Sequence, residues 1–310
     1  MRNAFVNTII DACLKEEDIF IISGDAGLGV FDDFQKQHPD RFLNLGVAEQ
    51  NTISVAAGMA LAGFRVYVYN IVPFVLYRCY EQVRNDICYQ NLPVTLIGIG
   101  AGLTYAPQGM THYSVEDLGI AQTLPNLRVF SPADPTEAEA AARITLAESQ
   151  PTYVRLAKRG EPRIHAGATV DASRPIIMAE GCDVTIVFHG TVANEAMSAH
   201  ELLREQGISA RVVSLPQVEP CPYDLISEAA EGTGEVITVE EHFVNSGLGA
   251  RLAFWHASHR PSWRLSCLGI APEYIHAIKK QDGMRNHYGI SASHIASHVR
   301  SLMNQTTGVR

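Results

Sequence analysis

Short runs of consecutive apolar residues alternate along the chain with longer segments in which apolar residues recur every three or four positions. Runs of the first kind are typical of strands buried in a parallel sheet, and segments of the second kind indicate helices. The predicted strands cover residues 18–23, 41–43, 65–69, 92–98, 153–156, 183–188, 208–214 and 235–242, with another beginning at residue 129, and the predicted helices include residues 3–14, 52–64, 193–205 and 250–258. This alternation predicts an α/β protein of two doubly wound domains, each with a mainly parallel sheet.

A polar stretch separates the two groups of elements. Residues 157–175 combine charged residues, prolines and glycines without a periodic apolar pattern, which is typical of a linker. We therefore expect a first domain at residues 1–160, a linker at 161–176 and a second domain at 177–310. Between residues 183 and 214 a strand, a helix and a strand follow closely, which predicts a βαβ unit with a right-handed crossover.

Composition limits the function more than the fold. The chain has 310 residues, of which 46% are hydrophobic and 18% charged, as is normal for a soluble globular protein. Its net charge of −9 argues against nucleic acids or anionic membranes as partners. The longest apolar stretch, residues 52–64, is too short to span a bilayer. The six cysteines are scattered without a Cys-x-x-Cys pair and no signal peptide is evident, so we expect free thiols and a cytoplasmic protein.

One carboxylate lies at the start of the most apolar helix. Glu49 falls between the strand at 41–43 and the helix at 52–64, whose side chains are apolar nearly all round, so we expect this helix to be buried. A charge at the mouth of a buried helix is costly unless it has a partner. Position alone leaves two interpretations open: Glu49 stabilises the helix N-terminus, where negative charge is favourable, or it serves a site.

The residues around Glu49 carry a family resemblance. Gly46-Val-Ala-Glu-Gln-Asn51 closely resembles the Gly-x-x-Glu-x-Asn signature in the pyrimidine-binding domain of the transketolase superfamily, whose enzymes use thiamine diphosphate. The resemblance implies that Glu49 is catalytic and binds the ring nitrogen of the cofactor's aminopyrimidine. The thiazolium carbon of thiamine must lose a proton to the cofactor's own amino group, and a carboxyl sharing a proton with the ring nitrogen favours the imino tautomer that accepts it. A desolvated pocket raises a carboxyl pKa and so favours this sharing.

Aromatic residues follow the strand at 65–69. Phe74, Tyr77 and Tyr80 are three apart and share one face of the helix predicted there. Most stripes of this kind are core packing, but the resembled family has aromatic residues here that stack on the aminopyrimidine. The resemblance therefore implies cofactor-binding roles for Phe74 first and Tyr77 next. A second aromatic residue that the family often carries three residues earlier falls at Ile71.

A glycine-rich loop follows the strand at 92–98. Its end, Gly109-Met-Thr-His112, resembles the Asp-Gly-x-Thr-His motif of the family, which implies that His112 is catalytic and faces the substrate. Outside such a motif, a loop histidine is usually just exposed. Two positions depart from the family: its aspartate is Gln108 here, and a histidine of ordinary transketolases falls near Gly100. Both help to hold a sugar phosphate donor, so we expect Gln108 to contact a different, modified substrate.

Further positions are candidate substrate-binding residues by the same resemblance. Arg2 matches an arginine that binds the sugar phosphate in transketolases, and Lys158 or Arg159 lies where another phosphate-binding arginine occurs. Asp25 takes the position of a serine that some transketolases use after the first strand. The alternatives are an ordinary surface position for Arg2 and a simple turn for the loop at 24–29.

The second half of the chain also resembles the family. Thr238-Val-Glu-Glu-His242 with Gly247-Leu-Gly249 is similar to the transketolase C-terminal domain, and we expect a structural hydrogen bond rather than catalysis from His242. The resemblance covers nearly the whole chain but only two of the family's three domains. The domain that grips the diphosphate binds Mg²⁺ through Gly-Asp-Gly and a downstream Asn, a combination that we do not find in this sequence. We therefore expect no metal ligands here and Mg²⁺ in a partner subunit.

The resemblance thus implies the beta subunit of a split transketolase, active only with an N-terminal diphosphate-binding subunit in an α2β2 assembly with contact between the β chains. The expected reaction transfers a two-carbon ketol unit from a ketose, phosphorylated or otherwise modified, to an aldehyde. The beta subunit of a pyruvate dehydrogenase-like enzyme that decarboxylates 2-oxo acids is the nearest alternative. A non-catalytic scaffold is another, although a scaffold would not need a buried carboxylate at Glu49.

Overall fold

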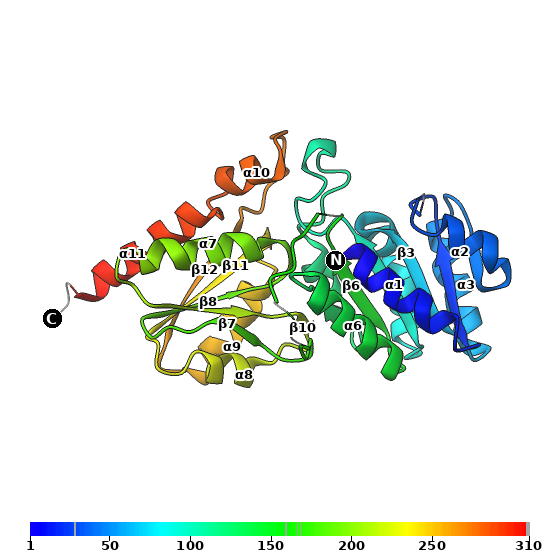
Figure 1. The fold of residues 1–310 in the computed structure, drawn as a ribbon, viewed down its shortest axis with the longest axis horizontal. Coiled ribbons are helices and arrows are strands. Elements are labelled where there is room, and N and C mark those ends of the chain that lie inside the picture. Colours follow the sequence, from blue (N-terminus) through cyan, green and yellow to red (C-terminus); the bar gives the residue numbers. More distant parts are fainter. Residues whose placement is uncertain (28, 159, 166, 168, 308–310) are drawn as a thin grey trace.

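The computed structural model describes residues 1–27, 29–158, 160–165, 167 and 169–307. Two α/β units lie next to each other, one built mostly from the first half of the chain and the other from the second half (Figure 1). Each unit has one sheet with helices against it, and the strands of both sheets are mostly parallel. The predicted α/β fold is therefore confirmed.

The first sheet has seven strands. They are β1 (Ile19–Ser23), β2 (Phe42–Asn44), β3 (Arg65–Ile71), β4 (Val94–Ile99), β5 (Arg128–Phe130), β6 (Thr152–Leu156) and β10 (Gln217–Glu219). Their order is β10-β5-β6-β4-β3-β1-β2, and all neighbours are parallel except β10 and β5. Because β10 comes from beyond the predicted linker, the second half of the chain completes the first sheet. The domain bounds themselves stay a prediction.

Helices cover both faces of this sheet. They are α1 (Arg2–Cys13), α2 (Asp32–Gln37), α3 (Glu49–Leu61), α4 (Tyr80–Gln82), α5 (Asp117–Ala121) and α6 (Pro135–Ala147), with the 3-10 helices η1 (Pro39–Arg41) and η4 (Ala106–Gln108). Successive side chains of a strand point to opposite faces. Val66 and Val68 of β3 pack with α3, whereas Tyr67 and Tyr69 pack with α1 and α6. The sheet is therefore doubly wound, as predicted.

The second sheet has five strands. They are β7 (Ile176–Ala179), β8 (Val184–Phe188), β9 (Ala210–Ser214), β11 (Glu235–Phe243) and β12 (Arg264–Ile270), in the order β12-β11-β8-β9-β7. Its helices are η5 (Gly190–Val192), α7 (Ala193–Arg204), α8 (Tyr223–Ala229), α9 (Leu248–His259), α10 (Gln281–His287) and α11 (Ala292–Thr307). α7 and α11 lie on one face and α8 and α9 on the other (Figure 1). β8, α7 and β9 form the predicted parallel βαβ unit.

Helix α3 is not buried all round, contrary to the expectation from its sequence. Ile53 and Ala56 are buried against the sheet, whereas Ser54 and Gly58 are exposed and Leu61 is 63% exposed. Only one side of α3 faces β3 and β4, and small residues do not reveal in advance which side of a helix that is. We call the exposed side, made of Ser54, Gly58 and Leu61, the outer strip of α3.

The segment after β3 is also less regular than predicted. It contains two π-helical pieces, η2 (Pro73–Tyr77) and η3 (Val83–Cys88), on either side of α4. π-helical turns are wider than α-helical ones and are common at functional sites. Phe74, Tyr77 and Tyr80 nevertheless face one common segment, because they contact residues 112–123 one after another. The prediction that these three aromatic residues share one face is confirmed.

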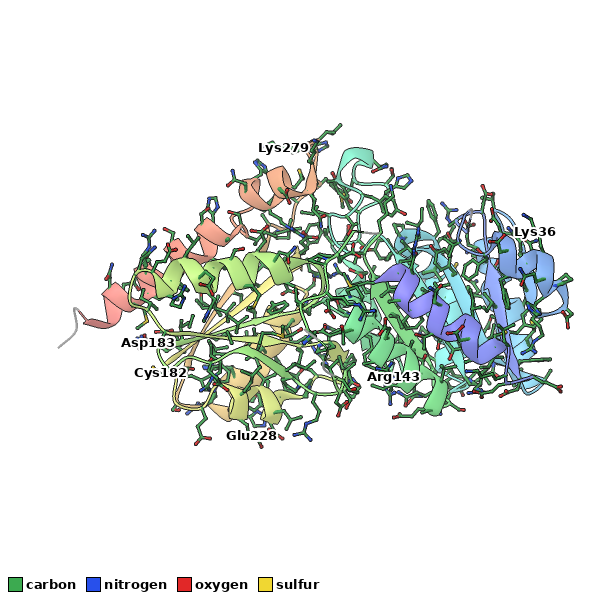
Figure 2. All side chains as sticks on the ribbon, in the orientation of Figure 1. Lys36, Arg143, Cys182, Asp183, Glu228 and Lys279 are labelled. Carbon is green, nitrogen blue, oxygen red and sulfur yellow. The ribbon has the colours of Figure 1, made fainter. Side chains whose placement is uncertain are left out.

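The outer surface of both units carries charged side chains. Lys36, Arg143 and Glu228 are exposed and point away from the sheets (Figure 2). The six cysteines are free, as predicted. Within the described ranges, no helix has the length and apolar character needed to cross a membrane.

Candidate active site

The parallel strands of the first sheet end at one edge, and most of the predicted site residues follow these ends. Asp25 follows β1, Glu49 follows β2, Phe74 and Tyr77 follow β3, Gln108 and His112 lie in the loop after β4, and Lys158 follows β6. Arg2 begins α1, the helix that precedes β1. In open α/β sheets, ligands bind outside the carboxyl ends of the strands because loops converge there. The topology thus brings distant motifs to one place.

Glu49 has the charged partner that its burial demands. It is the first residue of α3 and 8% exposed, and Nη1 of Arg78 donates to its Oε1 over 2.6 Å. The N-terminus of the helix adds a favourable dipole for this carboxylate. The sequence predicted the need for a partner but did not identify Arg78. The signal that could have found it is a cation four residues after Phe74, in a segment with several aromatic residues.

Phe74 joins this ion pair to the glycine-rich loop. The guanidinium carbon of Arg78 lies 4.5 Å from the ring centroid of Phe74, within the range of a cation–π interaction. The ring centroids of Phe74 and His112 are 6.0 Å apart, and the rings meet edge to face. The structure therefore brings Glu49, Phe74 and His112 together, with Arg78 between the first two.

Tyr105 extends this row of contacts to two cations. Its ring centroid lies 5.9 Å from that of His112 and 4.8 Å from Nζ of Lys158. Burial raises the pKa of Tyr105, and the nearby positive charge of Arg2 acts in the opposite direction. Arg2 and Lys158 therefore both lie near one ring at the sheet edge, where they can attract an anionic group.

Gly100 makes room for Tyr105. Its φ of +99° favours glycine, and a Cβ atom there would lie 2.3 Å from Cδ2 of Tyr105. A histidine at position 100, as in ordinary transketolases, is thus incompatible with this placement of the tyrosine. The sequence analysis singled out Gly100 but not Tyr105. The feature that could have identified Tyr105 is a single aromatic residue inside a glycine-rich loop.

Other predicted residues lie apart from this row. The hydroxyl of Tyr77 donates to Oε2 of Glu116 over 3.1 Å, and burial raises the pKa of both groups. Asp25 and Gln108 are exposed, and neither side chain forms a hydrogen bond with the rest of the described chain. Arg159 lies outside the described residues. Ligand-binding roles for these residues stay predictions.

The second unit binds both the glycine-rich loop and helix α5, which follows it. At the end of β11, Oε2 of Glu241 accepts a hydrogen bond from the amide of Leu103 over 3.0 Å, and Nε2 of His242 accepts one from the amide of Leu118 over 3.1 Å. Burial lowers the pKa of His242, so the ring is neutral and can accept there. Its Nδ1 donates to the carbonyl of Phe243 over 3.0 Å. The structural role predicted for His242 is confirmed.

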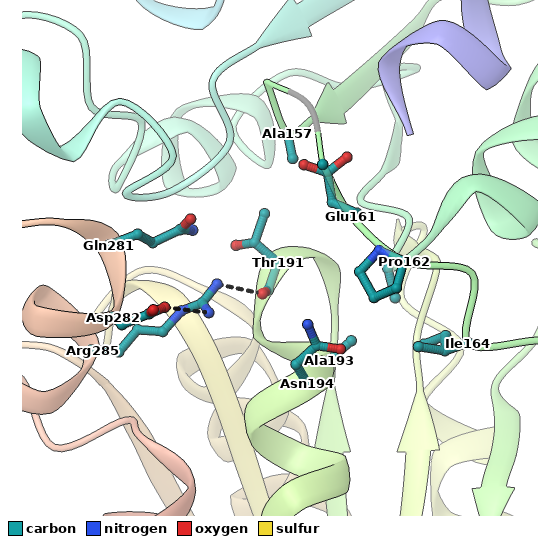
Figure 3. Close-up of a pocket in the computed structure, with 12 residues that line it drawn as sticks. Ala157, Glu161, Pro162, Ile164, Thr191, Ala193, Asn194, Gln281, Asp282 and Arg285 are labelled. Atoms are coloured by element: carbon teal, nitrogen blue, oxygen red, sulfur yellow. Dashed lines mark hydrogen bonds and ion pairs between the residues drawn. The ribbon is translucent and has the colours of Figure 1, made fainter.

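A separate cavity of about 200 Å³ lies between the two units (Figure 3). Arg285 on its wall donates to Oε1 of Glu241 and to the carbonyl of Thr191, each over 2.5 Å, and lies 3.6 Å from Asp282. Carboxylates thus neutralise the charge of Arg285. None of the predicted site residues is among those that line this cavity.

Across the described ranges, no group of three or more His, Cys, Asp or Glu side chains is placed to hold a metal ion.

Comparisons with known proteins identify the family of the chain. Residues 1–162 match the family described as transketolase, pyrimidine binding domain, and residues 175–295 match transketolase, C-terminal domain. The chain is 32% identical to one of the subunits of the apulose-4-phosphate transketolase of Actinobacillus succinogenes, over 97% of this chain and 98% of that protein. It is 32% identical to the 6-deoxy-6-sulfo-D-fructose transketolase subunit of a Clostridium species, over 82% of this chain and 79% of that protein.

A solved structure is similar over nearly the same length. It is described as a split gene transketolase, inactive beta4 tetramer, and matches with a TM-score of 0.84 and 31% identity over 97% of this chain and 96% of that one. Fold and site thus define an α/β protein with a buried carboxylate at the sheet edge. The chain belongs to the transketolase family and contains its pyrimidine-binding and C-terminal domains. The two relatives described above are transketolase subunits, and transketolases are transferases.

Proposed function

We propose that this chain is the beta subunit of a split transketolase that depends on thiamine diphosphate. With an N-terminal partner subunit it transfers a two-carbon ketol unit from a ketose to an aldehyde. The observation that carries the proposal is the row of contacts from Glu49 through Arg78 and Phe74 to His112. This row joins the carboxylate of the Gly-x-x-Glu-x-Asn signature to the histidine of the Gly-x-Thr-His motif.

The residues at this edge fit the aminopyrimidine end of thiamine diphosphate. When bound, the cofactor supplies the carbon nucleophile that breaks and forms carbon–carbon bonds. Glu49 offers a buried carboxylate that can share a proton with a ring nitrogen, and charge-assisted hydrogen bonds of this kind are strong. Phe74 offers a ring face for stacking. His112, in contact with Phe74, is placed to hold or move a proton of a substrate hydroxyl.

In this proposal the partner subunit holds the diphosphate and Mg²⁺. The cation needs oxygen ligands such as those of the family's Gly-Asp-Gly and Asn residues, which belong to a domain other than the two that this chain matches. The similar solved structure is described as an inactive beta4 tetramer, which supports a need for a second kind of subunit. The assembly proposed is α2β2, with the cofactor between the two kinds of chain.

The substrate proposed is a ketose that carries an anionic group. Arg2 and Lys158 near Tyr105 supply positive charge at the edge of the site. The two relatives described above are named for a sugar phosphate and a sulfo sugar. The hydroxyls of a sugar need hydrogen-bond partners when they are desolvated, since an unpaired buried polar group costs about 1–3 kcal/mol. Asp25 and Gln108 are proposed as such partners, and a 2-oxo acid would need fewer of them.

A substrate screen with the assembled enzyme tests the proposal. The chain is combined with its N-terminal subunit, Mg²⁺ and thiamine diphosphate, and ketose phosphates and sulfonated ketoses are compared with 2-oxo acids. We expect an aldehyde product from a ketose. Carbon dioxide from a 2-oxo acid, with no aldehyde from any ketose, would assign the chain to the pyruvate dehydrogenase-like branch, and assembly without any turnover would favour the scaffold. A cytoplasmic location, which suits six free thiols, is part of the proposal and is checked by cell fractionation.

A further inference from the structure

Arg78 engages both of the groups that the aminopyrimidine would use. Its Nη1 donates to Oε1 of Glu49 over 2.6 Å, and its guanidinium carbon lies 4.5 Å from the ring centroid of Phe74. These are the carboxylate and the ring that the proposed function assigns to the cofactor. A side chain that contacts both of them must influence how the cofactor binds.

The guanidinium group is chemically similar to an aminopyrimidine that is protonated on its ring. Both are planar and carry a delocalised positive charge. Both can present N–H groups to a carboxylate while one of their faces lies on an aromatic ring. At the distances observed, the Oε1 atom of Glu49 and the facing side of the Phe74 ring cannot serve two such groups at the same time. The arginine and the cofactor therefore compete for one place.

We propose that Arg78 occupies the place of the aminopyrimidine and that thiamine diphosphate binds only when the guanidinium leaves Glu49. This inference rests on the proposed function and deepens it. Arg78 is in this sense a positioning residue, because it acts through Glu49. It holds the buried carboxylate in one orientation and excludes weaker ligands from it until the cofactor takes over the contact.

The surroundings of Arg78 allow it to leave. Its side chain is 46% exposed and follows the π-helical turn η2, and among the described residues Glu49 is the one hydrogen-bond partner of its guanidinium. Arg155 provides a contrast within the same chain, because it is fully buried and donates to Asp117 and to two carbonyl groups. An arginine that is half exposed can turn to water at little cost when another group takes its partner, whereas a buried arginine cannot.

Competition of this kind links cofactor loading to subunit assembly. The guanidinium is tethered beside Glu49, so its effective concentration there is high, and a free pyrimidine would have to displace it without help. The diphosphate end of the cofactor, which the proposed partner subunit holds, supplies the additional binding free energy. The site is therefore expected to bind free pyrimidines and thiamine weakly and to bind thiamine diphosphate when the subunits associate.

The test measures the affinity of the assembled enzyme for thiamine diphosphate by calorimetry, independently of turnover. Arg78→Met keeps the length of the side chain and removes the competing charge. Arg84→Met is the matched control, because Arg84 is an exposed arginine on the same segment that bonds to its neighbour Asn85. We expect Arg78→Met to lower the dissociation constant by about five- to tenfold, which corresponds to one partly exposed ion pair, and Arg84→Met to leave it unchanged.

A second measurement separates competition from a general effect of charge. Guanidinium chloride, far below denaturing concentrations, should weaken cofactor binding by Arg78→Met, because the free ion can occupy the place that the side chain has left. The wild-type enzyme should not respond. Adding Glu49→Gln to Arg78→Met should abolish the response, because the amide no longer attracts the ion.

Unchanged or weaker cofactor binding by Arg78→Met, with normal thermal unfolding and normal subunit assembly, overturns the inference. So does a cofactor-bound crystal structure in which Arg78 still contacts Glu49. In either case the proposed function stands if the wild-type assembly transfers a ketol unit. If the wild-type assembly itself binds no thiamine diphosphate, the proposed function fails, and the inference fails with it.

Discussion

Single residues at the sheet edge act through their neighbours. Glu49 is bound by Arg78, which lies over Phe74, so that a change at one position alters the others. Both Arg78 and Phe74 come from the segment that follows β3, and neither lies within one helical turn of Glu49 along the chain. The function of this carboxylate is therefore best tested with a substitution that keeps its shape.

Glu49→Gln is expected to slow the loss of the thiazolium proton in the assembled enzyme by about 10²–10⁴-fold, because an amide cannot share a proton in the way a carboxyl does. The fold should persist, since Arg78 can turn to water and an ion pair that is half exposed contributes about 1 kcal/mol or less. Hydrogen–deuterium exchange at the thiazolium carbon, followed by NMR, measures the effect. Exchange at the wild-type rate would disprove the role, and Glu81→Gln, an exposed glutamate on α4, is the control.

Among the elements, α6 anchors the start of the predicted linker. Asp134 caps α6 by accepting a hydrogen bond from the amide of Glu137 over 2.8 Å, and it also accepts one from the amide of Ile164 over 2.9 Å. Nε2 of buried His165 lies 2.8 Å from Oε1 of Glu137. This hydrogen bond raises the pKa of His165, against the effect of burial. The attachment of the linker is therefore expected to depend on pH.

His165→Gln should lower the melting temperature more at about pH 6 than at about pH 8. The folded-state pKa of His165 lies above its unfolded value of about 6.5, so the protonated ring contributes stability that is fully present below that value and is lost as pH rises through the folded pKa. Thermal unfolding at several pH values measures the difference. An equal loss at every pH would refute the assignment, and His276→Gln, at an exposed position, serves as the control.

Helix α3 begins at Glu49, in the site proposed to lie between the two kinds of chain, and we therefore propose its outer strip as a contact with the N-terminal subunit. Leu61→Glu places a charge on this strip, where Leu61 is 63% exposed in the single chain, and should weaken assembly because a buried, unpaired charge is costly. Leu14→Glu, at the end of α1 and 53% exposed, is the matched control. Sedimentation velocity distinguishes the assemblies. If Leu61→Glu assembles as the wild type does, the strip is not a subunit contact.

For the whole molecule, the isolated chain is expected to bind thiamine diphosphate weakly or not at all. The reason is that the diphosphate and Mg²⁺ are assigned to a partner, so that only the aminopyrimidine end can find its contacts here. Calorimetric titration of the chain alone measures this, and the assembled enzyme under the same conditions is the positive control. Sub-micromolar binding by the isolated chain would contradict the division of the site between two subunits.

Features that depend on neighbouring residues in the chain could be predicted from the sequence, whereas features that depend on contacts between distant residues could not. Strands β3 and β4 follow directly from apolar runs, and Glu49 and His112 were found because short motifs fix their positions. Arg78 was missed because its contacts depend on the π-helical turn η2, which no local sequence pattern predicts. Tyr105 was missed because its placement depends on the backbone conformation of Gly100. The pairing of β10 with β5 was missed because β10 has three residues and a partner far away in the chain.

The crossing of β10 into the first sheet constrains how such a protein can be reshuffled by recombination. A breakpoint between residues 160 and 177 would join halves from different parents, yet β5 would then need a foreign β10 and Leu103 a foreign Glu241. A poor match would leave the edge of β5 open to pairing with other chains, which promotes aggregation. The two domains are therefore expected to be inherited together. Substitutions on one side of the contacts between β5 and β10 should be accompanied by compensating substitutions on the other side.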